Sequence, residues 1–116
     1  MPPLIHTEKQ GVCVVTINEK ALFEDTTVLR RRREIDELMK ENGVENLLLD
    51  LSPVELAGSA ALGMLIRLKG KCANEGCQLS LCGLQPTVSE VLKITQLDQI
   101  FDIYVDVDEA IQAIRA

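Results

Sequence analysis

Asn46-Leu-Leu-Leu-Asp-Leu51 is a near-continuous apolar run in the middle of the chain. Such runs are typical of strands that are buried on both faces, because a strand with one solvated face alternates apolar and polar residues. We therefore predict a central strand over residues 46–51. A turn at Ser52-Pro53 leads from this strand to Gly58-Ser59, where a helix is expected to begin.

That helix is predicted to run as far as Gly76, since glycine commonly ends helices. Apolar residues at helical spacing define its expected inner face, which comprises Leu62, Leu65, Ile66 and Cys72.

Two strands and two helices are predicted after it. Residues 78–84 and 100–105 are short aliphatic runs. Gln85-Pro86-Thr87 opens a helix in which Thr87 and Glu90 have capping-box spacing. Asp106 and Glu109 repeat that spacing at the start of the last helix. The inward residues of these helices are expected to be Val88, Val91, Leu92 and Thr95, then Val107, Ala110, Ile111 and Ile114.

On the amino-terminal side, residues 4–8 and 11–18 are rich in β-branched side chains and predict an antiparallel pair. Capping side chains at Asp25, Thr26 and Thr27 begin a helix that ends at Gly43. Its inner face is expected to carry Val28, Ile35, Leu38 and Met39.

The resulting order is β-β-α-β-α-β-α-β-α. Helices that alternate with apolar strands imply parallel crossover connections after the opening pair. The predicted fold class is α/β, with one domain over residues 1–116 in which helices cover a mixed central β-sheet.

Composition excludes several classes of function. The 116 residues are 47% hydrophobic, which allows one compact core. A net charge of -6 disfavours nucleic-acid binding, since no general source of phosphate attraction is present. No apolar run approaches the ~20 residues of a membrane-spanning helix, and the first residues lack a secretory pattern. We expect a cytoplasmic protein with no membrane insertion.

The four cysteines, Cys13, Cys72, Cys77 and Cys82, include no C-x-x-C pair, and His6 is the single histidine. We interpret the cysteines as small buried hydrophobes and not as metal ligands.

Arginines occupy positions 30–33, and acidic residues follow on the same predicted helix. A solvated charged face is therefore a better interpretation of this run than a phosphate-binding patch. The sequence also contains no Gly-rich phosphate loop, metal triad or nucleophile elbow. We expect no catalytic residue, no cofactor and no enzymatic activity.

Small residues gather at 56–64, where the buried strand connects to the helix. A serine at a helix start lies beside unpaired N–H groups at the positive end of the helix dipole, where a phosphate is stabilised. Ser59 therefore has two interpretations: a phosphorylated residue, or an ordinary N-cap after a turn that Gly58 relaxes. Met64 is equally ambiguous, as an exposed contact residue or as a core filler.

Residues 47–65 resemble the central strand and switch helix of the STAS domain, typified by bacterial anti-sigma factor antagonists. The segment from Glu75 to Phe101 resembles the next strand, the Pro-initiated helix and the Leu-Asp-x-x-Phe segment of that family, and Asp106-Val-Asp-Glu-Ala resembles the start of its last helix. The resemblance covers residues 11–114.

The resemblance implies a mechanism. In the family, an Asp-Ser-Ser-Gly-Leu-Gly motif begins the second helix, and its first serine is phosphorylated by a partner that is both anti-sigma factor and serine kinase. A phosphatase restores binding. Ser59 corresponds to that serine, and Leu62 and Gly63 correspond to the closing Leu-Gly.

Other positions depart from the motif. Gly58 replaces the acid, and Ala60 and Ala61 replace the second serine and the glycine. A further acid that the family has near this serine corresponds to Leu22 or Phe23. Gln96 stands where the family commonly has glycine.

The leading hypothesis is thus a partner-switching regulator that resembles an anti-sigma factor antagonist. It would bind an anti-sigma factor with serine-kinase activity, under control of phosphorylation at Ser59 and of a phosphatase. Its expected contact surface is formed by Gly58, Ser59, Ala60, Ala61, Leu62, Gly63 and Met64.

Two alternatives remain at this point. The first is a constitutive STAS-type binding module or assembly subunit without a phospho-switch, which the missing acids favour. The second is a nucleotide- or small-ligand-binding protein or a minor enzyme, which only the arginine run and the free helix ends support.

Overall fold

The structure is a computed structural model that describes residues 3–115. Hydrogen bonds join five strands into a sheet in the order β1-β2-β4-β6-β7. β1 pairs antiparallel with β2, and the other neighbours are parallel, which confirms the predicted mixed sheet. The strands are β1 (Leu4–Lys9), β2 (Val12–Ile17), β4 (Asn46–Asp50), β6 (Gln78–Cys82) and β7 (Asp102–Tyr104).

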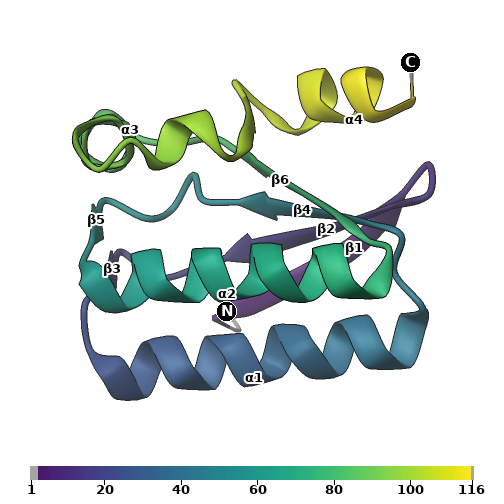
Figure 1. The fold of residues 1–116 in the computed structure, drawn as a ribbon, viewed down its shortest axis with the longest axis horizontal. Helices are drawn as coiled ribbons and strands as arrows, with labels where there is room; N and C mark the ends of the chain where they lie inside the picture. The colour runs from purple at the N-terminus through teal and green to yellow at the C-terminus, as the bar shows by residue number, and fades with distance from the viewer. Residues whose placement is uncertain (1–2, 116) are drawn as a thin grey trace.

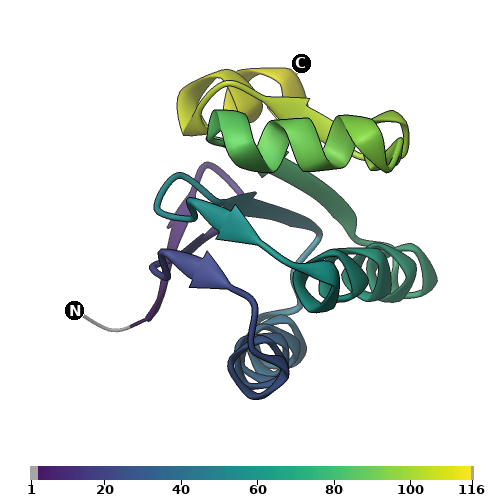
Figure 2. The ribbon, with the colours of Figure 1, turned by 90° about the vertical axis from the view of Figure 1, so that its left-hand side faces the viewer.

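Helices cover both faces of this sheet. Figures 1 and 2 show α1 and α2 on one side and α3 and α4 on the other. The helices are α1 (Asp25–Asn42), α2 (Ser59–Glu75), α3 (Pro86–Ile94) and α4 (Val107–Arg115), with a short 3-10 turn η1 (Leu97–Gln99) before β7. No helix among residues 3–115 combines the length and the apolar character that crossing a membrane requires.

β4 lies in the centre, between β2 and β6, and is buried on both faces as predicted. Leu47, Leu48 and Leu49 are each fully buried. Because side chains alternate along a strand, Leu47 and Leu49 join the core beneath α1 and α2, whereas Leu48 joins a smaller core beneath α4.

A second, two-stranded sheet was not predicted. β3 (Ala21–Leu22) and β5 (Leu56–Ala57) pair in parallel beside the main sheet. Each has only two residues, too few to show any periodicity.

Several local predictions were wrong. Glu24, and not Asp25–Thr27, is the N-cap of α1, and its side chain makes no capping bond. Ile66 was expected to face inward but is 48% exposed. Thr95 is exposed, and its hydroxyl donates to the Val91 carbonyl.

The two predicted capping boxes had different outcomes. The Thr87 hydroxyl donates to the Glu55 carbonyl and not to its own helix. At α4 the cap is confirmed, since the Glu109 N–H donates to Asp106 Oδ1 at 2.9 Å.

The arginine run is not uniformly solvated. Arg31 is only 3% exposed, and it forms ion pairs with Glu34 at 2.9 Å and with Glu19 at 3.8 Å. The expectation of a solvated face holds for Arg30 and Arg33, which are exposed. Arg31 instead connects α1 to the segment between β2 and β3.

We expect Arg31→Ala to lower the free energy of unfolding by about 1–2 kcal/mol, because it removes buried stem packing and two ion pairs. Arg30→Ala is the matched control and should change it by less than about 0.5 kcal/mol. Urea denaturation measures the free energy of unfolding of both variants. Equal effects of the two substitutions would contradict the role of Arg31 as a buried, ion-paired residue.

Gly83 directly follows β6 at a site where a side chain cannot fit. Its φ is +71°, and a Cβ there would lie 2.8 Å from Asp50 Oδ1 and 3.2 Å from the Ser52 nitrogen. Asp50 in turn accepts from the Ser52 N–H at 3.0 Å, so the side chain and the turn hold each other in place.

Gly83→Ala should therefore destabilise the fold by roughly 2 kcal/mol, from left-handed strain and overpacking. Gly70→Ala, in the middle of α2 where a Cβ meets nothing within 4 Å, should stabilise it by about 0.5–1 kcal/mol. The signs should be opposite in thermal or chemical unfolding.

Candidate functional site

The start of α2 places Ser59 one position later than an N-cap. Gly58 is the N-cap, with an extended backbone (φ −97°, ψ −174°), and its carbonyl accepts from the Leu62 N–H at 3.2 Å. The interpretation of Ser59 as an N-cap is therefore wrong: Ser59 is the first helical residue. Its side chain is exposed, and its hydroxyl has no hydrogen-bond partner among residues 3–115.

The surroundings of the Ser59 hydroxyl are open to an anion. The N–H groups of Ser59, Ala60 and Ala61 precede the first intrahelical donor, Leu62. The first turn of α2 contains no acidic residue. Backbone donors and the positive end of the helix dipole are thus not offset by a carboxylate in that turn.

Phe23 occupies the space beside the N-cap. A Cβ built on Gly58 would lie 2.7 Å from Phe23 Cδ1 and 3.2 Å from Cε1, so the ring covers the glycine. The Gly58 N–H also donates to the Leu22 carbonyl at 3.0 Å. Glycine is therefore required at position 58 because the Phe23 ring lies so close to it, and not because of its backbone angles.

The approach to α2 is fixed from two sides. On one side, the Lys20 carbonyl accepts from the N–H groups of Glu55 and Leu56, at 2.7 and 3.1 Å. On the other side, Gln85 Nε2 donates to the Ser52 carbonyl at 2.7 Å. With the bond from Thr87, these contacts hold the 52–57 segment between β3 and the start of α3.

The predicted contact range is only partly available. Ser59 is exposed, and Gly58, Ala60, Leu62 and Gly63 are partly buried. Ala61 and Met64 are each 2% exposed, so their side chains offer a partner almost no surface. Met64 is a core filler, and its interpretation as an exposed contact residue was wrong.

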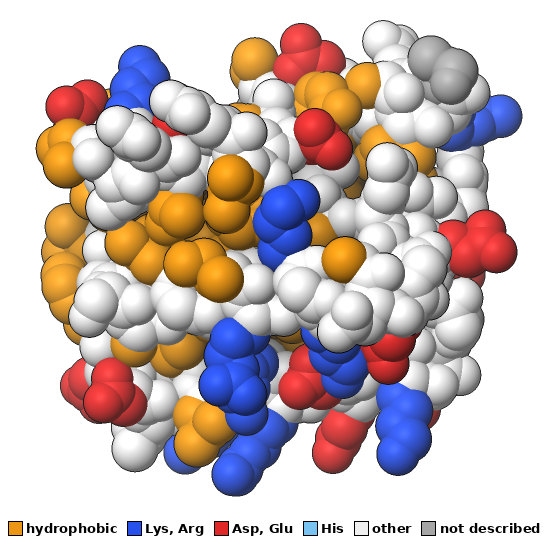
Figure 3. All heavy atoms as spheres, in the orientation of Figure 1, with side chains coloured by type: hydrophobic (Ala, Val, Ile, Leu, Met, Phe, Trp, Pro, Cys, Tyr) orange, Lys and Arg blue, Asp and Glu red, His pale blue; other side chains and the backbone are white. Residues whose placement is uncertain are grey.

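Exposed apolar residues extend the surface beyond this range, and sequence reasoning missed them. Phe23 is 54% exposed beside Gly58, and Leu56 is 48% exposed on β5. Figure 3, which views the molecule from the side of α2, shows hydrophobic side chains gathered around α2 and the neighbouring end of α3, with Lys and Arg side chains between α2 and α1.

Ala60, Gly63 and Met64 also line a groove between α1 and α2. Leu29 adds an apolar wall, and Arg32 and Arg67 lie along it. This groove continues the contact surface from the start of α2 along one side of the helix.

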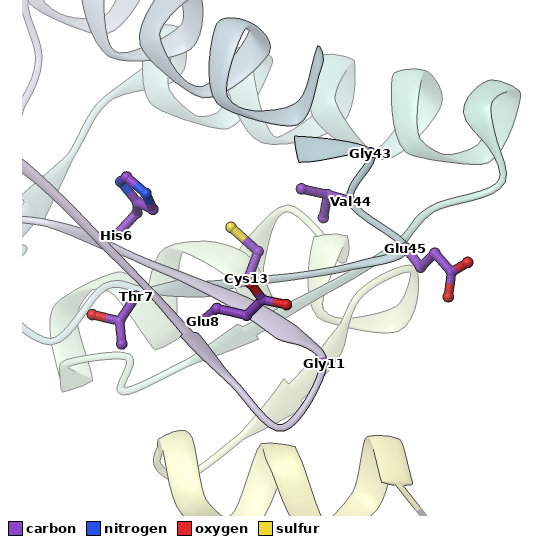
Figure 4. A pocket seen from close by; sticks show the side chains of 8 residues that line it. All are labelled: His6, Thr7, Glu8, Gly11, Cys13, Gly43, Val44 and Glu45. Atoms are coloured by element: carbon purple, nitrogen blue, oxygen red, sulfur yellow. The ribbon is translucent and has the colours of Figure 1, made fainter. Parts of the chain in front are cut away.

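A separate cavity of about 400 Å³ lies between the β1–β2 hairpin and the connection from α1 to β4 (Figure 4). His6 and Glu8 line it from β1, Glu45 lines it from the connection between α1 and β4, and Cys13 of β2 lies at its inner side. Residues 3–115 contain no group of three or more side chains that could hold a metal ion. All four cysteines are buried, as predicted.

The Phe23–Gly58 contact can be tested by a double-mutant cycle. Gly58→Ala should destabilise the wild type by about 1 kcal/mol more than it destabilises Phe23→Ala, since truncating the ring removes the clash. Chemical denaturation of the four proteins gives the coupling. Additive effects would show that the ring does not constrain position 58.

Proteins of similar sequence and similar structure support the fold described above. A protein of Thermotoga neapolitana, inferred to be an anti-sigma factor antagonist, is 29% identical over 102 residues, which are 88% of this chain and 89% of the relative. The crystal structure of a Thermotoga maritima protein with the same inferred role has a TM-score of 0.88 at 22% identity, over 97% of this chain and 95% of that one. An anti-sigma factor antagonist from Mycobacterium paratuberculosis has a TM-score of 0.85 at 25% identity, over 97% and 93%.

The family model of the STAS domain matches residues 4–110, a range that begins at β1 and therefore includes a strand that the sequence resemblance left out. This chain belongs to the STAS domain family.

Proposed function

We propose that this chain is an anti-sigma factor antagonist-like regulator that acts by binding and catalyses no reaction itself. Its partner is a cytoplasmic anti-sigma factor with serine-kinase activity, and phosphorylation of Ser59 switches the binding off. Relatives with anti-sigma factor antagonist names support the role, and the geometry around Ser59 supports the switch.

The observation that carries the proposal is the position of Ser59. An exposed hydroxyl on the first helical residue, with no hydrogen-bond partner among the described residues, is available to a kinase without unfolding of the helix. A phosphate there gains from the free first-turn amides, so the modified form is compatible with the fold.

The effect on the partner follows from the neighbouring surface. Phe23 and Leu56 expose apolar side chains near Ser59, and a partner that covers them must desolvate that region. A phosphate adds about two negative charges at pH 7. Burying these charges against an apolar or acidic partner surface is unfavourable, and a phosphatase reverses the change.

The constitutive binding module is the second candidate, and the Phe23–Gly58 contact favours it. Gly58 stands where the resemblance places the acid of the motif, and the ring that packs on it belongs to Phe23, which with Leu22 is one of the two positions that correspond to the further acid. In that case the surface around Phe23 binds its partner permanently, and Ser59 contributes only a small side chain at the helix start.

The partner itself is identified by affinity capture from the native host, followed by intact-mass measurement of the recovered protein. We expect an ATP-binding serine kinase-like anti-sigma factor, together with a fraction of this protein that carries one phosphate. Ser59→Ala should abolish that mass increase. Phosphate that persists in Ser59→Ala, or a captured set without such a kinase, would contradict the proposal.

Titration calorimetry with that partner separates the two candidates. Ser59→Asp should weaken binding at least tenfold, about 1.4 kcal/mol, if a charge at this position acts as the switch. Gln112→Glu is the control, because it adds one negative charge at an exposed position on α4. Equal affinity for wild type and Ser59→Asp would support the constitutive module.

A further inference from the structure

The carboxyl end of α2 brings two cysteines together. Cys72 lies in the last turn, Gly76 adopts a left-handed conformation (φ +73°), and the Cys77 N–H donates to the Cys72 carbonyl at 2.8 Å. This turn folds the chain back over the end of the helix, so that the side chains of Cys72 and Cys77 come close together.

The two thiols are neighbours in the core. Cys77 Sγ donates to the Gln78 carbonyl at 3.6 Å, and the neighbouring Cys72 thiol shifts the pKa of Cys77. Both residues belong to the same core cluster and are 1% and 6% exposed. Two buried thiols that the turn at Gly76 holds next to each other need little movement to form a bond.

The two thiols are not equivalent. The neighbouring Cys72 thiol lowers the pKa of Cys77, and the backbone of Leu47 acts in the same direction, against the opposing effect of burial. The same thiol pair raises the pKa of Cys72, and burial adds to that shift. Cys77 is thus the better nucleophile of the pair, since the thiolate is the reactive form.

The other two cysteines differ from this pair. Burial raises the pKa of Cys82 to about 12, and Asp50 and Asp106 add to the effect. Cys82 belongs to the second core cluster, beneath α4. Burial likewise raises the pKa of Cys13.

Access to the pair requires only local opening. The residues between the two cysteines, 73–76, are all exposed. Helix ends open at a small fraction of the free energy of global unfolding. Opening of this last turn exposes Cys77 without disturbing the central strands.

We propose that Cys72 and Cys77 form a redox-active dithiol, which hydrogen peroxide converts to an intramolecular disulfide. The Cys77 thiolate attacks a peroxide oxygen and the O–O bond breaks, which leaves a sulfenic acid at Cys77 and, after protonation, one water. The Cys72 sulfur then attacks the Cys77 sulfur, the S–O bond breaks, and the Cys72 proton leaves with the oxygen as a second water. The dithiol loses two electrons and hydrogen peroxide gains them.

The disulfide would link the last turn of α2 to the residue that precedes β6, at the end of the helix opposite Ser59. The modification is thus separate from the site of the proposed function, and its test does not depend on any partner.

The test uses the full chain, reduced and then treated with hydrogen peroxide, denatured and alkylated with N-ethylmaleimide. The reduced protein should take up four maleimides, one for each cysteine. The oxidised protein should take up two, and dithiothreitol should restore four. Uptake of four after peroxide treatment, or irreversible addition of oxygen without loss of two sites, would overturn the proposal.

Peptide mapping assigns the bond. Cleavage after Lys71 and Glu75 separates Cys72 from Cys77, so a disulfide keeps fragment 72–75 linked to the following fragment until it is reduced. Cys77→Ser should abolish this link, and Cys82→Ser, the control, should retain it. Fragmentation of the linked wild-type peptides identifies the partner sulfur without any variant, and a bond to Cys13 or Cys82 would refute the assignment.

Discussion

The burial of β4 on both of its faces is the constraint on which the rest of the structure depends. Three consecutive leucines supply apolar surface to two cores at once, so helices must pack on both sides of the sheet. Because the strand also pairs in parallel with both neighbours, each connection has to cross over the sheet. The chain that leaves β4 enters the 52–57 segment, and this segment delivers the start of α2 to the surface.

The candidate site is therefore held by backbone contacts more than by side chains. The carbonyls of Lys20, Leu22, Ser52 and Glu55 accept the hydrogen bonds that fix the approach to α2 and its N-cap. These bonds restrain the position of Ser59 while leaving its side chain exposed. A rigid frame around an exposed small residue suits a modification that must alter binding without altering the fold.

Sequence reasoning succeeded where a pattern extends over many residues and failed where a single contact decides. The alternation of apolar runs and helical stripes predicted the main sheet and the four helices. The two-residue strands β3 and β5 carry no such pattern. Ser59 was equally beyond reach as a first helical residue, because glycine and serine are both good N-caps and only the bond to the Gly58 carbonyl distinguishes them.

Long-range side-chain partners were unpredictable for the same reason. Thr87 has the spacing of a capping residue, yet its hydroxyl bonds to Glu55 on another segment. Arg31 was indistinguishable from its neighbours in the run, although it alone meets Glu19. Gln96 gave one useful signal: it stands where the family commonly has glycine, and its backbone is left-handed with a φ of +61°.

The packing of Phe23 on Gly58 also has a historical consequence. An acidic side chain at position 58 collides with the ring as long as Phe23 is present, so the two positions cannot be exchanged in an arbitrary order. A lineage that moved between this sequence and one with an acid before the serine would have passed through a small residue at position 23 or at position 58. A large ring at position 23 and an acid at position 58 are thus alternatives, which constrains the order in which the two positions can change.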